Sequence, residues 1–319
     1  MDGLMKVYCA VTSELNQIMK VYCAEPSSIL KEVIMKVYCE DSQDIMNNPQ
    51  ILKKLPSFNI LTSFYYIKDL SIYLPFANNM LIDSGAFTLQ QKKKANYTKY
   101  FKEYCKFVEA HHNNPKIQGF FELDIHEKVG YNQVLEYRKE LFEITSKIIP
   151  VWHKPLGLNE YKKMCDNYNY IGVSCVKDRS IPSNKYGSFV GYAHQHQTKF
   201  HGLGMLRPKI LDKVPFDSVD GTGWFKAARF GKRKNRKINT NYIKQNRVNL
   251  VFLELLDHIR FQRKYEEKWK NYQIKQNFKY GGNPNAKTIK NRIIQYISKY
   301  ILYLFNHKQH ISIQNIHNI

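Results

Sequence analysis

The sequence predicts an α/β protein with eight parallel strands and a basic helical extension at its C-terminal end. Short runs of β-branched and aromatic residues alternate with segments whose apolar residues recur at helical spacing. Eight parallel strands joined by right-handed crossovers favour closure into a (β/α)8 barrel. The 319 residues suffice for one barrel with an appendage. An open, doubly wound sheet is the alternative fold.

Strands and helices alternate as far as residue 220. The expected strands are residues 35–39, 58–65, 79–83, 117–124, 148–153, 170–174, 199–204 and 216–220. Helical spacing is clearest at residues 97–112, 131–146 and 158–168. We place the barrel domain at residues 35–235.

A literal repeat precedes this domain. Met-Lys-Val-Tyr-Cys occurs at residues 5–9, 19–23 and 35–39. The repeat is too short for a solenoid unit, so we read it as a local duplication in which the last copy forms the first strand. Residues 1–34 are then a repeated segment that the fold does not require.

Positive charge is concentrated after the last strand. The formal net charge is +22, and residues 225–319 hold 21 Lys/Arg against 4 Asp/Glu. Two basic helices are expected there, at 246–275 and 287–308, and we assign residues 236–319 to a helical extension that adds no barrel unit. Such asymmetry indicates a polyanionic partner, because basic side chains that neutralise phosphates release counterions. A solvated, Lys-rich surface is the alternative explanation.

Several classes of protein are disfavoured. The six cysteines form no C-x-x-C pair, so neither a disulfide framework nor a zinc knuckle is expected. The chain does not start with the pattern of a signal peptide, and its most apolar late run, 293–305, is too short to cross a bilayer. We expect a protein of a reducing, cytosol-like compartment with no membrane partner.

Acidic, histidine and glycine residues gather where the expected strands end. They are Asp83, Asp124, His153, Gly172, His201, Gly202, Gly204 and Asp220. Each alone has a plainer explanation as a helix cap or turn residue, but a barrel brings the carboxyl ends of its strands together on the catalytic face. Three aspartates around one pocket suit glycosidic chemistry, in which one carboxylate attacks the anomeric carbon and another transfers protons. Backbone next to Gly85 and Gly172 would let a flat purine approach.

Four motifs resemble a known family, the tRNA-guanine transglycosylases, and more closely their phage and bacterial relatives called DeoxyPurine in DNA protein A. The most specific is Asp83-Ser84-Gly85-Ala86-Phe87, which those closer relatives also carry. The others are Pro150-Val151-Trp152-His153, the segment from His201 to Gly204, and the segment from Ser218 to Trp224. The resemblance covers residues 35–235.

The resemblance implies a TIM barrel that replaces guanine in nucleic acid by a 7-deazaguanine through a covalent glycosyl-aspartate. DNA modification is favoured over tRNA modification, in a phage-encoded or bacterial cytosolic protein. Asp220 would be the nucleophile, Asp83 the general acid/base, and Asp124 the partner of the guanine amide edge. The other substrate-binding residues would be Ser84, Gly85, Phe87, His153, Gly172, His201, Gly202 and Gly204. No metal or other cofactor is expected.

The sequence departs from the family at two places. No cysteine follows residue 175, so the zinc subdomain of the transglycosylases is missing and a basic extension replaces it. The family's motif here is Ser-Val-Asp-Ser-Thr-Ser-Trp, and Gly221 and Gly223 replace its second and third serines beside the expected nucleophile. Asp217 is therefore the alternative nucleophile. Asp217 should point to the opposite side of the strand, and we prefer Asp220 for that reason.

Nucleic acid is the expected macromolecular partner. Six basic residues directly follow the last strand and are the expected phosphate contacts for a flipped guanine: Arg229, Lys232, Arg233, Lys234, Arg236 and Lys237. Two other functions fit the sequence less well. A metal-dependent amidohydrolase would use His153, His201 and Asp220 but lacks a His-x-His on the first strand. A barrel that binds nucleic acid without chemistry is the third possibility.

Overall fold

A computed structural model describes residues 19–24, 57–66, 69–71, 73–175, 181–221, 232–233, 236–237 and 254–270. The chain divides into two compact units, Met1–Gln273 and Ile274–Ile319, and all the described residues belong to the first. The strand expected at 35–39, the helix expected at 287–308, and Arg229 and Lys234 lie outside the described residues. The α/β class and the parallel pairing of the strands are confirmed.

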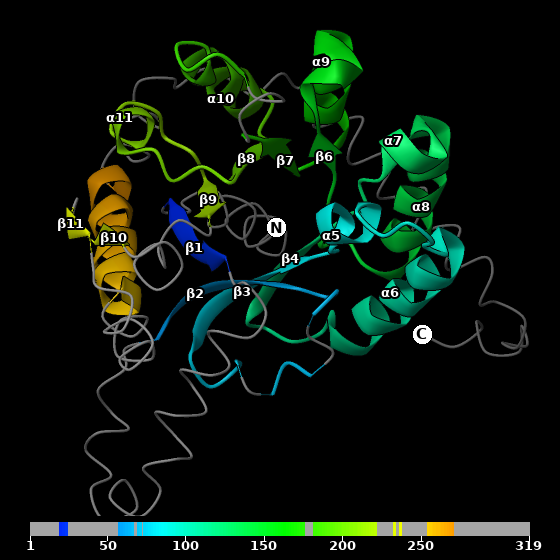
Figure 1. Ribbon diagram of the computed structural model, residues 1–319. Helices are drawn as coiled ribbons and strands as arrows, with labels where there is room; N and C mark the ends of the chain where they lie inside the picture. The colour runs from blue at the N-terminus through cyan, green and yellow to red at the C-terminus, as the bar shows by residue number, and fades with distance from the viewer. Residues whose placement is uncertain are drawn as a thin grey trace, which may run out of the picture. The chain divides into compact units, whose positions relative to one another are not determined.

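One nine-stranded parallel sheet forms the centre of the first unit (Figure 1), in the order β5-β4-β3-β2-β1-β9-β8-β7-β6. Its strands are β1 (Lys20–Ala24), β2 (Phe58–Ser63), β3 (Ala77–Asp83), β4 (Ile117–Phe121), β5 (Ile148–Ile149), β6 (Val151–Trp152), β7 (Tyr170–Ser174), β8 (Lys199–Leu203) and β9 (Ser218–Gly221). Apart from 35–39, each expected strand is present to within three residues of its predicted ends. A separate antiparallel pair joins β10 (Lys232–Arg233) to β11 (Arg236–Lys237).

Pro150 divides one extended run into β5 and β6. Proline has no N–H to donate to a neighbouring strand, so pairing is interrupted at this residue. On one side of the interruption β5 pairs with β4, and on the other β6 pairs with β7. The buried Glu122 carboxylate compensates at this point, since it accepts a hydrogen bond of 2.6 Å from the Val151 N–H and is paired with Arg138 at 2.6 Å.

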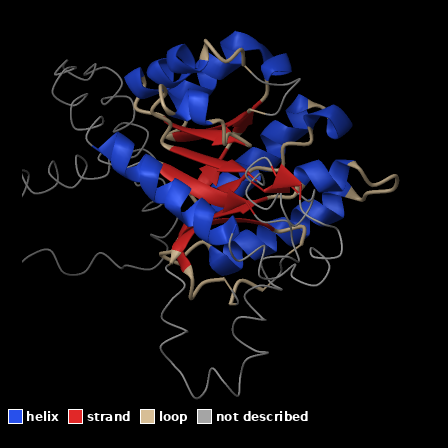
Figure 2. Ribbon diagram, turned by 60° about the vertical axis from the view of Figure 1, so that its left-hand side comes forward, coloured by secondary structure: helices blue, strands red, loops and turns tan. Residues whose placement is uncertain are grey.

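Helices lie on the outer side of the strands (Figure 2). They are α5 (Ala86–Gln90), α6 (Tyr97–His111), α7 (His126–Val129), α8 (Tyr131–Ile144), the 3-10 helix η3 (Lys154–Leu156), α9 (Gly157–Asn167), α10 (Tyr186–Gln195) and α11 (Pro208–Leu211). The three helices expected from spacing are α6, α8 and α9. The Asn96 side chain caps α6 by accepting from the Lys99 N–H at 2.9 Å, and one face of α6 buries Phe101 and Tyr104.

The first strand comes from the second copy of the repeat, which corrects the expectation that the last copy forms it. β1 spans Lys20–Ala24 and lies between β2 and β9. Met19 and Tyr22 are buried in the core. The folded unit therefore includes part of the segment 1–34 that the repeat pattern set aside. Three copies of the same five residues carry the same strand propensity, so sequence alone does not distinguish them.

The helix at residues 254–270, drawn in orange in Figure 1, also corrects an expectation. We assigned it to an extension outside the barrel, but its buried Leu255 and Trp269 belong to the two cores beneath the outer helices. The Gln262 side chain accepts from the Asn59 N–H at 3.1 Å and donates to the Asn59 carbonyl at 3.0 Å. At the start of β2, the helix thus makes the backbone hydrogen bonds that a neighbouring strand would make. Its basic residues lie on its exposed face, and they are the reason that the sequence suggested a separate extension.

Alternation along the strands decides which residues reach the site. The inner side of the sheet buries an apolar cluster of Tyr22, Leu61, Leu81, Phe121, Ile149 and Val151. Side chains two positions apart on a strand share a face, so Asp83 lies on the same face as Leu81, and His153 on the same face as Val151. The polar ends of the strands therefore continue the inner row, beyond the apolar cluster.

Candidate active site

Three carboxyl groups share one region at the carboxyl ends of the strands. Asp83 ends β3, Asp124 follows β4 by three residues, and Asp220 lies in β9. Burial, followed by the charge of Asp124 and with a smaller contribution from Asp220, raises the pKa of Asp83 to about 7. A carboxyl group with this pKa exchanges a proton near neutral pH, as a general acid/base must.

Gly85 holds the Asp83 carboxylate from the following turn. Its N–H donates to Asp83 Oδ2 at 3.0 Å, and this bond lowers the pKa of Asp83 against the larger effect of burial. Gly85 has a φ of 81°, and a Cβ there would lie 2.4 Å from Tyr65 Cβ. Only glycine fits a turn with this conformation and this close a neighbour.

Replacing Gly85 by alanine should therefore destabilise the fold by about 2 to 4 kcal/mol, through a strained backbone and overpacking. Gly187 is the matched control, because it lies in α10 with no atom within 4 Å of its Cβ position. Gly187→Ala should leave stability unchanged or raise it by about 0.5 to 1 kcal/mol. Denaturant unfolding measures both variants, and equal stabilities would contradict this account of the turn.

Asp220 is held in the same manner and by one further group. The Gly204 N–H donates to Asp220 Oδ1 at 2.8 Å, and Gly204 also has a positive φ, of 72°. His201 Nε2 lies 3.1 Å from the same oxygen. Asp220 is 7 % exposed, so it is largely buried with a small part of its surface open.

Asp217 points away from the site, as the strand geometry predicts. Its carboxylate accepts from the Phe200 N–H at 2.7 Å and lies 2.8 Å from His194 Nε2 on α10. Burial alone would lower the pKa of His194, but the charge and hydrogen bond of Asp217 together raise it. The Asp217 carboxylate thus bonds to groups on the outer side of the sheet. Asp220, in β9, is the aspartate that faces the other carboxyl groups.

A histidine pair accompanies Asp124. His153 Nε2 lies 2.7 Å from Asp124 Oδ2, and the rings of His126 and His153 are 4.9 Å apart. His153 follows β6 and His126 begins α7, so both come from the turns that follow strands. His153 fixes the orientation of the Asp124 carboxylate, and the His126 ring packs against His153.

The other expected binding residues differ in their access to a ligand. Phe87 on α5 is 75 % exposed. Ser84 is buried, and its hydroxyl donates to the Glu122 carbonyl at 2.8 Å. Gly172 and Gly202 are packed, since a Cβ would lie 3.0 Å from Phe121 at the first and 3.0 Å from Met205 at the second. Both positions therefore require glycine for packing, and at Gly172 this differs from the open approach for a base that the sequence suggested.

Sequence reasoning missed two polar residues beneath the site. Tyr170 of β7 and Ser218 of β9 hydrogen-bond to each other, and Ser218 Oγ lies 2.6 Å from His201 Nδ1. Ser218 stands two residues before Asp220, and this spacing was the available signal, because alternate residues of a strand share a face. It was missed because Ser218 was read only as part of the motif that ends β9.

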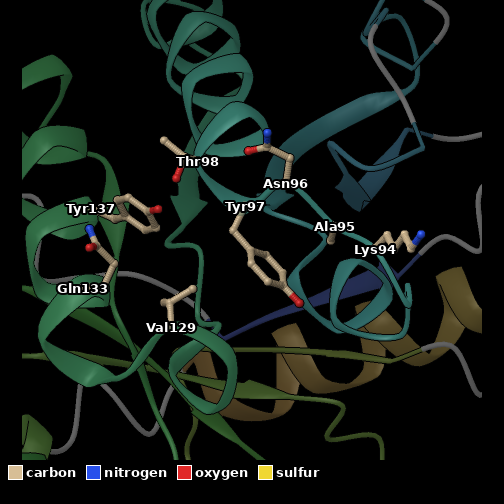
Figure 3. A pocket seen from close by; sticks show the side chains of 8 residues that line it. All are labelled: Lys94, Ala95, Asn96, Tyr97, Thr98, Val129, Gln133 and Tyr137. Carbon is tan, nitrogen blue, oxygen red and sulfur yellow. The ribbon is translucent and has the colours of Figure 1, made fainter.

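A cavity of about 570 Å³ lies elsewhere, where α6 and α8 begin (Figure 3). It is lined by Lys94, Ala95, Asn96, Tyr97, Thr98, Val129, Gln133 and Tyr137. No expected site residue lines it, so we locate the site by its carboxyl chemistry. Over the described ranges, no three His, Cys, Asp or Glu side chains are grouped as a metal site.

No helix among the described residues is long and apolar enough to cross a membrane. Comparison of the sequence with protein-family models and with curated proteins gives no match. A functional assignment therefore depends on the residues of the site.

Proposed function

We propose that the nine-stranded sheet is a closed (β/α)8 barrel and that the protein is a guanine transglycosylase-like enzyme acting on nucleic acid. The strand order supports closure. Each strand lies beside its neighbour in sequence, the first strand pairs with the last, and Pro150 alone separates the two strands at the ends of the order. A doubly wound sheet reverses its strand order at a switch point, and this sheet has no such reversal among its described strands.

The observation that carries the proposal is the contrast between Asp83 and Asp220. The first has a pKa of about 7 and can carry a proton, whereas the second has one carboxylate oxygen anchored by two donors. In glycosidic chemistry, one carboxyl group acts as the acid and another as the nucleophile. Their surroundings assign these roles by keeping the first protonated and the second ionised.

The proposed reaction has two displacements at C1′ of the target nucleotide. Asp220 attacks C1′ and forms a C1′–O bond as the bond to guanine N9 breaks; guanine leaves with the electron pair and takes a proton from Asp83. The incoming 7-deazaguanine then loses its N9 proton to Asp83 and attacks C1′, which releases the Asp220 carboxylate. The base is exchanged, and both aspartates return to their starting states.

Asp124 is the proposed partner of the base. Guanine presents two parallel N–H donors on its amide edge, which match the two oxygens of one carboxylate. His153 holds Asp124 from one side, and the exposed Phe87 ring is available to stack on a base. These contacts favour guanine and its 7-deaza analogues over pyrimidines.

Base exchange is tested by incubating the protein with radiolabelled guanine and, separately, with DNA and tRNA. The proposal expects label to enter DNA in preference to tRNA, and unlabelled 7-deazaguanine to chase it out. Activity that persists in a chelator separates this reaction from a metal-dependent hydrolase. Failure of both polymers to acquire label would contradict the proposal.

The β10–β11 pair is the proposed contact with phosphates. Its register places Lys232 opposite Lys237 and Arg233 opposite Arg236. The pairing brings four basic residues together in two short strands, so one polyanion could meet several positive charges there.

Changing Lys232, Arg233, Arg236 and Lys237 to Gln should weaken DNA binding and lower the salt dependence. We expect the slope of log K against log salt to fall by up to about 3 to 4, at 0.9 for each lost phosphate contact. The control is a Gln variant of four exposed residues elsewhere: Lys102, Lys106, Lys139 and Lys209. Equal slopes for the two variants, measured by fluorescence anisotropy, would refute this role.

A further inference from the structure

A chain of hydrogen bonds runs from the interior of the sheet to Asp220. Tyr170 Oη bonds to Ser218 Oγ, which lies 2.6 Å from His201 Nδ1, and His201 Nε2 lies 3.1 Å from Asp220 Oδ1. The members come from three adjacent strands, β7, β8 and β9. His201 is fully buried and Ser218 is 2 % exposed.

The Asp220 carboxylate sets the direction of the chain, because a carboxylate only accepts and His201 Nε2 must therefore donate to it. Burial raises the pKa of Tyr170 well above its ordinary value, so the phenol keeps the proton that it can donate to Ser218 Oγ. Ser218 can then donate to His201 Nδ1, which leaves the imidazole proton on Nε2, facing Asp220. The ring centroids of Phe121 and Tyr22 lie 4.9 and 6.3 Å from that of His201, and these rings exclude water from the imidazole.

We propose that His201 is a positioning residue for Asp220, an inference that rests on the proposed function and deepens it. His201 Nε2–H and Gly204 N–H both donate to Oδ1. Among the described residues no group donates to Oδ2, which is left as the attacking oxygen. Ser218 and Tyr170 act through His201 by holding the tautomer in which Nε2 carries the proton. His201 therefore does not touch the substrate.

A buried polar chain could also serve only to pack the sheet, so the test needs measurements that packing does not change. His201→Phe keeps the ring and removes both hydrogen bonds. It should lower kcat for base exchange on the order of 10- to 100-fold and leave KM for the nucleic acid unchanged. Ser218→Ala and Tyr170→Phe should lower kcat on the order of threefold to tenfold. Tyr161→Phe is the control, because it removes a buried phenol that bonds to the Phe189 carbonyl in the outer layer.

The imidazole nitrogens give a readout that does not depend on activity. In a two-bond proton–nitrogen spectrum, the His201 signal, identified by its loss in His201→Phe, should show the Nε2-protonated tautomer. Ser218→Ala should mix the two tautomers, and Tyr161→Phe should not. A proton on Nδ1, a doubly protonated ring, or a rise in KM with unchanged kcat would overturn the inference. If wild-type protein exchanges no base, the proposed function fails, while the spectrum still reports on the chain.

Discussion

Asp220→Asn should abolish base exchange, with a loss on the order of 10⁴-fold or more, because it removes the group that forms the covalent bond to C1′. The asparagine can still occupy the same space and accept from Gly204 and His201, so the fold should persist. The measurement is the rate at which labelled guanine enters nucleic acid.

Asp217→Asn is the matched control, three residues earlier in the chain and on the outer side. It weakens the contact with His194 on α10 and leaves the carboxylate of the site in place. Its exchange rate should stay within about threefold of wild type, as expected for a residue that makes no contact with the reacting atoms. Equal losses in the two variants would show that neither acts as the nucleophile.

Asp83→Asn should lower the exchange rate by about 10²- to 10⁴-fold and at the same time stabilise the protein at pH 8. The activity falls because the proton donor is lost. The stability rises because a carboxyl group with a raised pKa resists ionisation in the folded state, whereas the amide carries no charge.

The direction of the pH effect follows from the two pKa values of Asp83, about 7 in the folded protein and about 3.9 in the unfolded chain. Between them the folded state binds the proton and the unfolded state has lost it, so wild-type stability falls as pH rises from 4 to 7. This loss is on the order of 4 kcal/mol, and the variant escapes it.

Denaturant unfolding at pH 4 and pH 8 measures this difference. The advantage of Asp83→Asn should be small at pH 4 and largest at pH 8. Glu136→Gln on the exposed face of α8 is the control and should show no such change. The wild-type exchange rate should also fall as pH rises through about 7, since the reaction needs protonated Asp83. If Asp83→Asn is no more stable than wild type at pH 8, then Asp83 ionises in the folded protein without the cost proposed here.

Much of the fold could be predicted from the sequence because strands and helices follow from the local spacing of apolar residues. Seven strands and three helices agree with the expectation from apolar spacing, and the charges of Asp124 and Asp220 act on Asp83, as expected for carboxyl groups that lie near one another. Parallel strands place their carboxyl ends on one side, so Asp83, Asp124 and Asp220 converge although they are far apart in the chain.

The missed features depend on tertiary contacts. The second copy of the repeat forms β1 because it fits between β2 and β9, and no property of its five residues marks it. The helix at 254–270 covers the sheet through Leu255, Ile259, Tyr265 and Trp269, which its basic composition concealed. The hydrogen-bond chain below Asp220 required knowing that three adjacent strands bring Tyr170, Ser218 and His201 together.

The most direct test of the central claim is to trap the bond between Asp220 and the sugar. The protein is mixed with nucleic acid while released guanine is removed, denatured, and examined for a complex that survives detergent. The account predicts an adduct whose digested peptide carries a sugar ester on Asp220, present in Asp217→Asn and absent in Asp220→Asn. An adduct located on another residue, or base exchange by wild-type protein with no adduct under these conditions, would contradict it.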